Sequence, residues 1–356
     1  MRPEDFVEDS PGEIEMVDGI FTYSPDPLPP DLDPSHDLVT QNGEAMYALG
    51  QLSDLETWLD SPEVILCPLV HREAADSSSI ETISRVTLSD LYRREAGEDV
   101  GTTETERADI AEAANYIDAT HLGIELLEAG EEIDRSLLQQ LHEVLMSGVR
   151  GAEKHPGEFR DELVGIGEPG QSLDEARFVP TAPASVLYAL RSLLQYLRTE
   201  SRYAPLIEIA LVHYQFETIH PFHDGNGRMG RLLIMLALYR RDILPGPYLY
   251  PSAYFNERRE TYLDRLLAVS QDGAWTEWVE FFLEGIATQS REAYTVAREL
   301  LALRERYREQ YEGAGAVVTE LIDFIIRQPY FTEPQAVKAT GRSQPAVNKW
   351  IRQLWD

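Results

Sequence analysis

Twelve residues in the second half of the chain, His220 to Arg231, carry the side chains best suited to chemistry. They read HPFHDGNGRMGR. His220 carries an imidazole, which titrates near neutral pH and can act as a general base. Asp224 is a carboxylate in the same stretch, and Mg²⁺ is typically held by one or two carboxylates together with substrate phosphates. The stretch thus combines a potential base with a potential metal ligand.

The remaining residues of this stretch favour anion binding. Gly225 and Gly227 allow the backbone to turn sharply and allow a ligand to approach the amides closely. A helix that begins near Asn226 would direct its free N–H groups and its positive end toward the loop. Arg228 and Arg231 are three residues apart on one helical face, and arginine suits bidentate phosphate contacts. The pattern therefore predicts a site for a polyphosphate.

The segments on both sides of this stretch have no polar stripe. Residues 205–216 (PLIEIALVHYQF) and 232–239 (LLIMLALY) are apolar almost all round, which is typical of buried helices. Taken singly, a Gly-Asn-Gly turn, a His beside a Pro and two Arg at i, i+3 are ordinary structural features. Their combination in a loop between two buried helices favours a functional site.

The stretch resembles the signature of the Fic family, H-x-F-x-[D/E]-G-N-G-R-x-x-R, at all eight defined positions. The resemblance implies a mainly α fold, with a Fic-type helical core and a small β-hairpin flap. It also implies transfer of AMP from ATP to a Ser, Thr or Tyr hydroxyl of a target protein, or of the chain itself, with release of pyrophosphate. The implied roles are His220 as general base, Asp224 as the Mg²⁺ ligand, and Gly225, Asn226, Gly227, Arg228 and Arg231 as nucleotide-binding residues.

A second motif stands at residues 76–83 (DSSSIETI), before the expected core. By itself, a serine run followed by Glu81 indicates a helix start with an acid in its first turn. Beside a Fic core it resembles the family's inhibitory motif, [S/T]-x-x-x-E-[G/N], which Ser77 and Glu81 match and from which Thr82 departs. The resemblance implies that Glu81 pairs with Arg231, which withholds that cation from a nucleotide phosphate and repels the γ-phosphate.

Composition excludes several classes of protein. The single cysteine, Cys67, rules out an internal disulfide framework and a cysteine cluster for zinc. No apolar run approaches the ~20 residues of a membrane span, and the first ten residues lack a signal-peptide pattern. We therefore expect a cytoplasmic protein without a membrane partner.

The net charge of −31 comes from 62 acidic residues against 31 basic ones, of which only three are lysines. Such diffuse acidity with little lysine favours adaptation to high salt over mere avoidance of nucleic acid. Because the Debye length falls to ~3 Å at 1 M salt, the self-repulsion of a halophilic protein is screened there. We expect circular dichroism to show loss of structure as salt is removed. Full structure at low salt would contradict the halophilic interpretation.

Further patterns divide the chain. Residues 1–40 hold eleven acidic residues and seven prolines, so we expect an extended arm that is ordered only from about residue 20. Two β-prone runs, 163–166 and 176–180, predict a hairpin. The family resemblance implies that this hairpin is a flap whose edge pairs with the backbone of a target segment, and a plain connecting hairpin is the alternative. Trp275–Ile286 is expected to close the core, before a separate charged helix. The expected segments are the arm (1–40), an N-terminal helical region with the inhibitory motif (41–100), the Fic core (101–290), a linking helix (291–315) and a helix-turn-helix module (316–356).

The last segment resembles the winged-helix module found on many Fic proteins. Its final helix, expected from Ser343 to Leu354, carries Gln344, Asn348, Lys349 and Arg352. With five basic and four acidic residues, 316–356 is much less basic than a strong DNA binder. DNA binding, docking and homodimer formation remain alternatives for it. Three functions likewise remain open for the whole chain: AMP transfer, AMP removal with Glu81 orienting a water, and a DNA-binding regulator with a nucleotide-sensing Fic domain.

Overall fold

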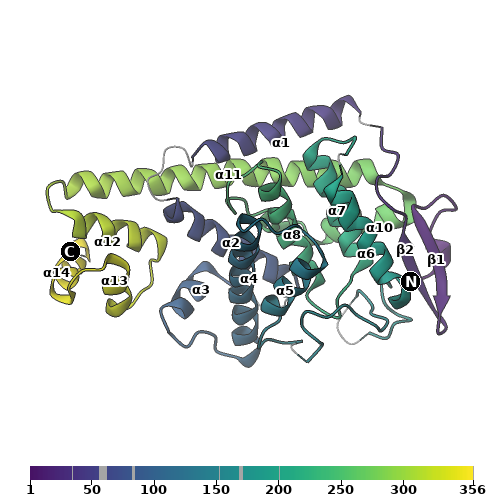
Figure 1. Cartoon of the computed structure of the whole chain (residues 1–356), viewed down its shortest axis with the longest axis horizontal. Helices are drawn as coiled ribbons and strands as arrows, with labels where there is room; N and C mark the ends of the chain where they lie inside the picture. The colour runs from purple at the N-terminus through teal and green to yellow at the C-terminus, as the bar shows by residue number, and fades with distance from the viewer. Residues whose placement is uncertain are drawn as a thin grey trace.

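The computed structural model describes residues 1–33, 35–55, 62–81, 85–151, 153–167, 171–199 and 201–355. Helices dominate, as the sequence predicts, and one small antiparallel sheet accompanies them (Figure 1). The elements are η1 (Pro3–Asp5), β1 (Gly12–Val17), β2 (Ile20–Pro25), α1 (His36–Asp54), α2 (Glu63–Glu81), α3 (Leu88–Glu95), α4 (Glu104–Glu128), α5 (Arg135–Leu145), α6 (Pro183–Arg198), α7 (Pro205–Ile219), α8 (Asn226–Arg240), α9 (Ser252–Glu257), α10 (Arg259–Asp272), α11 (Trp275–Gln310), α12 (Ala316–Arg327), α13 (Glu333–Thr340) and α14 (Gln344–Trp355).

The core is organised around α7 and α8, which pack against each other. Both helices are buried on nearly every side, as their apolar sequences predict. Two adjoining groups of buried side chains meet at this pair. One group also includes α1, α9, α10 and α11, and the other includes α4, α5 and α6. The loop between α7 and α8 is therefore held on both sides by a packed core.

Helix α11 runs the length of the molecule beside α1 (Figure 1). It is one helix of 36 residues, so the prediction of two separate helices, one ending at Ile286 and one linking to the tail, is wrong. No Pro or Gly stands between Ala287 and Arg291, and nothing there ends the helix. Gly285 lies inside it and gives space for the rings of Tyr254 and Phe255.

The N-terminal segment was expected to be ordered only from about residue 20, and this is wrong, because residues 1–15 are part of the fold. β1 and β2 form a hairpin in which Gly12 pairs with Pro25 and Val17 with Ile20. Its turn is Asp18-Gly19, both with positive φ, the geometry of a two-residue hairpin loop. The acidic and Pro-rich composition concealed this Asp-Gly signal and the alternation in EIEMV.

The N-terminal hairpin lies against the segment predicted to be the flap. The Tyr23 N–H donates to the Val179 carbonyl at 3.0 Å, and the Tyr23 ring lies 5.7 Å from that of Phe178. The flap itself is reduced to one antiparallel bridge between Ile166 and Phe178, and residues 168–170 lie outside the described residues. The small sheet is thus N-terminal, and the flap contributes a single bridge.

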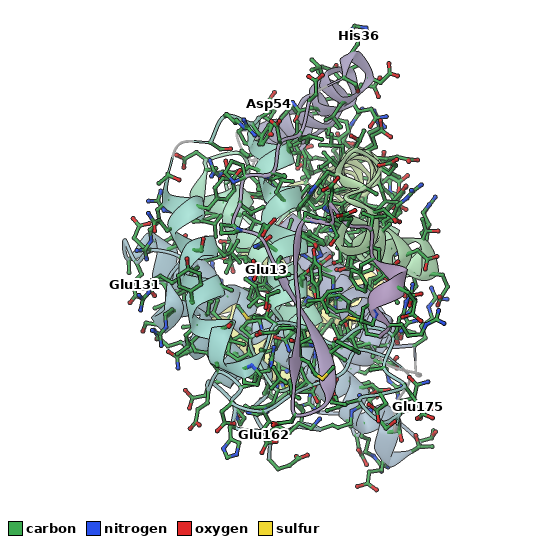
Figure 2. All side chains as sticks on the ribbon, turned by 90° about the vertical axis from the view of Figure 1, so that its right-hand side faces the viewer. Glu13, His36, Asp54, Glu131, Glu162 and Glu175 are labelled. Atoms are coloured by element: carbon green, nitrogen blue, oxygen red, sulfur yellow. The ribbon has the colours of Figure 1, made fainter. Side chains whose placement is uncertain are left out.

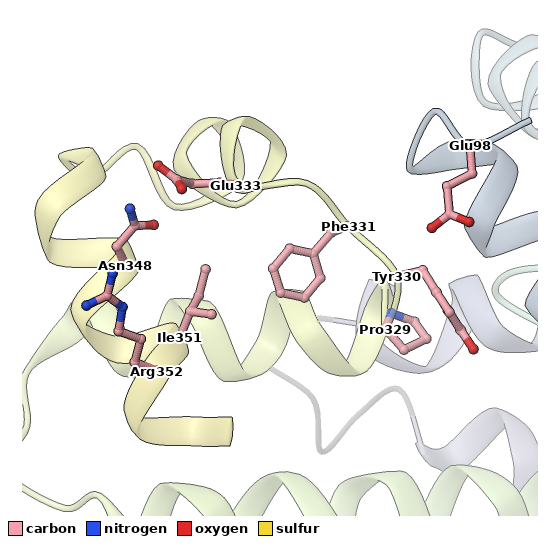
Figure 3. Close-up of a pocket in the computed structure, with 8 residues that line it drawn as sticks. All are labelled: Glu98, Pro329, Tyr330, Phe331, Glu333, Asn348, Ile351 and Arg352. Atoms are coloured by element: carbon pink, nitrogen blue, oxygen red, sulfur yellow. The ribbon is translucent and has the colours of Figure 1, made fainter. Parts of the chain in front are cut away.

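Helices α12, α13 and α14 pack around a small apolar cluster of their own, which includes Phe324 and Val347. This unit contacts α3, since Gln335 Nε2 donates to the Glu95 carbonyl at 2.6 Å. A cavity of about 490 Å³ is lined by residues of this C-terminal unit together with Glu98, which follows α3 (Figure 3). At the turn before α14, Arg342 pairs with Glu320 at 2.6 Å. One of the five basic side chains of residues 316–356 is therefore already neutralised. DNA binding by this unit stays a prediction.

Acidic side chains stand on the surface of many elements. Glu13, Asp54, Glu131, Glu162 and Glu175 all project outward in Figure 2. None of the helices in the described ranges is long and apolar enough to cross a membrane. Burial raises the pKa of the Cys67 thiol to about 11, which suits a packing residue better than a reactive one.

Candidate active site

The loop between α7 and α8 adopts the left-handed backbone conformation at two points, which costs energy at His220 but not at Gly225. His220 follows α7 with φ 52° and ψ 62°, the left-handed conformation, and its N–H donates to the Phe216 carbonyl at 2.9 Å. Gly225 precedes α8 with φ 72°, and a Cβ there would also collide with the sulfur of Met146. A non-glycine residue with positive φ is uncommon and often functional. The chain turns twice here so that His220 and the start of α8 lie together.

Asn226 closes this loop with its own side chain. Its Oδ1 accepts the Phe222 N–H, and its Nδ2 donates to the Phe222 carbonyl, both at 2.8 Å. The sequence predicted a nucleotide contact for Asn226, but in the structure the whole amide is engaged with the loop. The side chain thereby fixes the Gly225–Gly227 turn.

His142 on α5 supports the loop, a role that no sequence motif indicated. Its Nε2 donates to the Asp224 carbonyl and its Nδ1 accepts the Gly157 N–H, both at 2.9 Å. Its ring stacks on Phe222 with centroids 3.8 Å apart. Burial lowers the pKa of His142 to about 4, so the neutral tautomer required by these two bonds is the stable one.

Arg160 is a second side chain that supports the loop. This buried guanidinium donates to four backbone carbonyls. It binds His220 at 2.7 Å, Ile219 at 3.2 Å and Glu162 at 3.0 Å, and it also binds Thr181. One side chain therefore ties the base of the loop to the segment that follows the flap.

Replacing Arg160 with methionine should destabilise the protein by about 3 kcal/mol or more, because four buried carbonyls lose a charged donor at once. Denaturant unfolding with the exposed Arg94→Met as matched control would measure this. A loss below about 1 kcal/mol would show that water or neighbouring groups replace the guanidinium.

The imidazole of His220 is prepared to accept a proton. Its Nδ1 lies 3.2 Å from the Glu217 carbonyl, which can only accept, so Nδ1 carries the hydrogen and Nε2 keeps its lone pair. Burial, together with the positive charge of Arg160, lowers the pKa of His220 to about 4. His220 is therefore neutral at physiological pH, as a general base must be.

A cavity of about 400 Å³ opens beside His220. It is bounded by the loop and the first turns of α8, by the end of α2, by α10 and by the flap residues near the Ile166–Phe178 bridge. Its lining combines charged and polar groups with three leucines of α10. This combination suits a ligand with an anionic part and an apolar part. The polar residues that concern us are Glu81, Glu217, His220, Gly227 and Arg231.

Arg231 is the buried cation of this cavity, and α2 holds it. Its Nε donates to Ser77 Oγ at 2.9 Å, and its Nη2 donates to the Ser77 carbonyl at 3.0 Å and to Glu81 Oε1 at 2.8 Å. Burial raises the pKa of Glu81, but the charge of Arg231 outweighs this and leaves it below its usual value. The pairing expected from the sequence is present, and Glu81 is ionised within it.

The carboxylate of Glu81 also covers the N-terminus of α8. A Cβ on Gly227 would collide with Glu81 Oε1, so this oxygen lies directly against the first turn of the helix. An anion is favoured at that position. Glu81 thus occupies both the cation and the helix end that a phosphate would use.

Ser77 to Glu81 form the end of α2, and the expectation of a helix start there is wrong. α2 continues through the serines: Ser77 and Ser78 are buried, and Ser79 Oγ donates to the Ala75 carbonyl at 2.7 Å. Thr82, the position that departs from the inhibitory motif, lies outside the described residues.

Asp224 lies at the edge of the site with a partly exposed carboxylate. Its Oδ2 is 2.9 Å from Lys154 Nζ, and its Oδ1 accepts the Gly225 N–H at 2.7 Å. Burial raises its pKa, but Lys154 outweighs this and keeps Asp224 ionised. No group of three or more His, Cys, Asp or Glu in the described ranges is arranged to hold a metal. One hard oxygen ligand is present, which fits Mg²⁺ only in company with substrate phosphates and with Lys154 displaced.

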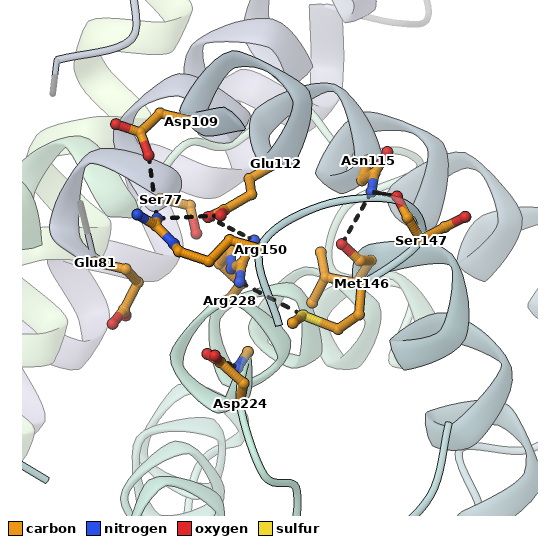
Figure 4. A network of polar contacts seen from close by, with 12 residues as sticks. Ser77, Glu81, Asp109, Glu112, Asn115, Met146, Ser147, Arg150, Asp224 and Arg228 are labelled. Carbon is orange, nitrogen blue, oxygen red and sulfur yellow. Dashed lines mark hydrogen bonds and ion pairs between the residues drawn. The ribbon is translucent and has the colours of Figure 1, made fainter. Parts of the chain in front are cut away.

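Arg228 does not line the cavity, although the sequence predicted a phosphate contact for it. Its guanidinium lies 3.0 Å from buried Glu112 on α4, and Arg150 lies 3.1 Å from both Glu112 and Asp109 (Figure 4). The Arg228–Glu112 pair joins α8 to α4, and Arg150 ties the segment after α5 to α4. Contact with a phosphate would require Arg228 to leave Glu112, so its present role is to hold the start of α8.

Three comparisons bear on this site. The Fic/DOC family model matches residues 132–238, and the Fic/DOC family N-terminal model matches residues 39–125. A probable protein adenylyltransferase of Aquifex aeolicus is 26% identical over 214 residues, 59% of this chain and 60% of that protein. Protein adenylyltransferase fic-1 of Caenorhabditis elegans is 38% identical over 71 residues, 19% of this chain and 14% of that protein. The chain thus spans less than two thirds of the length of these curated relatives.

Solved structures share the fold. A Fic family protein from Desulfovibrio desulfuricans has a TM-score of 0.63 at 23% identity, with 90% of this chain and 89% of that chain covered. Fic-1 from C. elegans has a TM-score of 0.57 at 18% identity, with 75% and 74% covered.

Proposed function

Because the chain belongs to the Fic/DOC family, we propose that it is a protein adenylyltransferase that moves AMP from ATP to a Ser, Thr or Tyr hydroxyl. The observation that carries this proposal is one shared cavity. It brings together the neutral His220, the N-terminus of α8 and the buried cation Arg231. A base, a phosphate site and room for a nucleoside are what such a transfer requires.

In the proposed reaction, His220 Nε2 accepts the proton of the target hydroxyl. The hydroxyl oxygen then bonds to the α-phosphorus of ATP, and the bond from that phosphorus to the bridging oxygen of pyrophosphate breaks. Amides at the start of α8 and the Arg231 guanidinium stabilise the phosphate charge, and such electrostatic positioning supplies most of the catalysis in phosphoryl-type transfer. Asp224 would hold Mg²⁺, which supplies further neutralisation when it is bound with ATP.

The flap supports a protein as the acceptor. Its Ile166–Phe178 bridge lines the same cavity as His220, and the N-terminal hairpin braces it from behind through Tyr23. A backbone edge at this place can hold a target segment by strand addition, which presents a hydroxyl without selecting particular side chains.

The contacts of Arg231 support self-inhibition. Ser77 and Glu81 together hold the guanidinium, and Glu81 fills the helix end where a phosphate would bind. In this state ATP must compete with an ionised carboxylate for one cation. The resting chain is therefore proposed to be a weak transferase.

Labelled ATP tests the reaction itself. The Glu81→Gly variant, incubated with a cell lysate, should pass label to protein from α-labelled ATP and not from γ-labelled ATP. Label from the γ-position would indicate phosphate transfer instead. Equal labelling by a His220→Ala control would show that the signal has another source.

A further inference from the structure

Glu217 is a second carboxyl group in the cavity, and the proposed reaction does not use it. It stands in the last turn of α7, and its side chain is only 13% exposed. It lines the cavity together with Glu81, His220 and Arg231. Among the described residues, its Oε1 is buried without a hydrogen-bond partner. An unpaired buried carboxyl oxygen is costly, so it requires an explanation.

His213 lies close to Glu217 but does not donate a hydrogen bond to its carboxyl group. His213 Nε2 lies 4.0 Å from Oε1, which is too far for a hydrogen bond. His213 Nδ1 faces the Gly230 carbonyl at 3.2 Å and must carry the ring hydrogen, so Nε2 accepts from the Tyr262 hydroxyl at 2.8 Å. His213 therefore has no second hydrogen for Glu217.

Glu217 lies against α8, the helix that carries Arg231. A Cβ on Gly230 would collide with Glu217 Oε1, just as one on Gly227 would collide with Glu81 Oε1. The two carboxyls thus lie against α8 about one turn apart, and both line the cavity that Arg231 also lines. A phosphate that displaced Glu81 from Arg231 would therefore share this cavity with Glu217.

Building on the proposed function, we propose that Glu217 binds the nucleotide as a neutral carboxylic acid and donates a hydrogen bond to a phosphate oxygen beside Arg231. An ionised Glu217 would repel the phosphates and could not donate. The neutral form supplies a donor and adds no negative charge to the site. Glu217 is therefore a positioning residue that makes nucleotide binding depend on one proton.

The surroundings of Glu217 agree with a neutral group near pH 7. Burial raises its pKa to about 8, with Arg231 on α8 acting against this and Glu81 on α2 acting in the same direction. The other titrating neighbours stay outside this range. The pKa values of His213 and His220 are lowered by burial to about 3 and about 4, and burial raises that of Tyr262 on α10 well above its usual value.

The affinity for ATP should depend on pH through the proton on Glu217. Loss of Glu81 lowers the pKa of Glu217 in the free protein, whereas bound phosphate raises it in the complex. Between these two values ATP binding takes up a proton, so the affinity falls as pH rises. In the Glu81→Gly protein, the dissociation constant of Mg–ATP should increase at least about tenfold from pH 7 to pH 9.

Calorimetric titration of Mg–ATP into the full chain tests this inference. Glu81→Gly/Glu217→Gln should bind at pH 7 within about threefold of Glu81→Gly and show no decline to pH 9, because the amide donates without titrating. Glu81→Gly/Glu217→Leu should bind about three- to tenfold more weakly at pH 7, since it lacks the donor. Glu81→Gly/Glu260→Gln, with an exposed acid of the same cavity changed, should keep the full decline.

Affinity of Glu81→Gly that is constant from pH 7 to pH 9 would overturn the inference, as would an equal decline in the Glu217→Gln protein. The same titration separates the inference from the proposed function. ATP binding with the expected pH dependence but without AMP transfer would contradict the proposed adenylyltransferase activity and would still support the role of Glu217. Absence of ATP binding would overturn both.

Discussion

Replacement of Glu81 with glycine is expected to raise AMP transfer by about tenfold to a hundredfold. The change removes a charged hydrogen bond to Arg231, which is worth about 1.5–3 kcal/mol, and every 1.4 kcal/mol corresponds to about tenfold. It also uncovers the first turn of α8 at Gly227. Initial rates of label transfer from α-labelled ATP, measured for wild type and variant at equal protein concentration, check the prediction.

A second substitution separates the two effects of Glu81. Glu81→Gln keeps the shape of the side chain over Gly227 but removes its charge, so it should give an intermediate rate. Glu260→Gln, in the same cavity but without contact to Arg231, should leave the rate within about twofold of wild type. Unchanged transfer by Glu81→Gly would contradict self-inhibition by this carboxylate.

Replacement of His220 with alanine in the Glu81→Gly protein is expected to lower the rate of transfer by about 10²- to 10⁴-fold, the usual contribution of a positioned general base. ATP affinity should change by less than about threefold, because Arg231 and the α8 N-terminus remain. The measurement is a pair of values for each variant, the single-turnover rate and the dissociation constant of ATP.

Backbone strain at His220 requires a control. The residue has φ 52°, a conformation that asparagine adopts more readily than alanine. His220→Asn should therefore fold at least as well as His220→Ala while lacking the base. If both variants lost ATP binding as well as transfer, His220 would be a structural residue of the loop.

Local sequence signals were sufficient to predict the helix–loop–helix that carries the candidate site. The types and spacing of His220, Asp224 and Arg231, with two apolar segments around them, predicted a buried helix–loop–helix, and the structure has it. The ion pair of Glu81 with Arg231 was expected from the resemblance and is present. Its inhibitory effect remains a proposal.

Long-range contacts could not be predicted in the same way. His142 and Arg160 bind backbone groups of the loop, and any side chain with the right reach could do so, which leaves no spacing to recognise. Arg228 matched the motif, yet its partner is Glu112, more than a hundred residues earlier. Such pairings are fixed by tertiary packing. The N-terminal hairpin was not predicted for a different reason. The acidic, proline-rich composition of this segment favours disorder and masks the Asp18-Gly19 turn.

AMP removal is the reaction that would reverse the role of Glu81. There the carboxylate would orient a water for attack, and its loss would lower activity. The contacts with Arg231 and Gly227 favour an obstructing role, because the carboxylate is ionised, paired and placed at the phosphate end of the cavity.

Intact-mass spectrometry after incubation with ATP and Mg²⁺ in high salt, for wild type and Glu81→Gly side by side, tests the central claim most directly. The account predicts an AMP-sized increase in the mass of the Glu81→Gly chain and little or none in the wild type. Equal modification of both proteins, or modification of the wild type alone, would contradict a transferase restrained by Glu81.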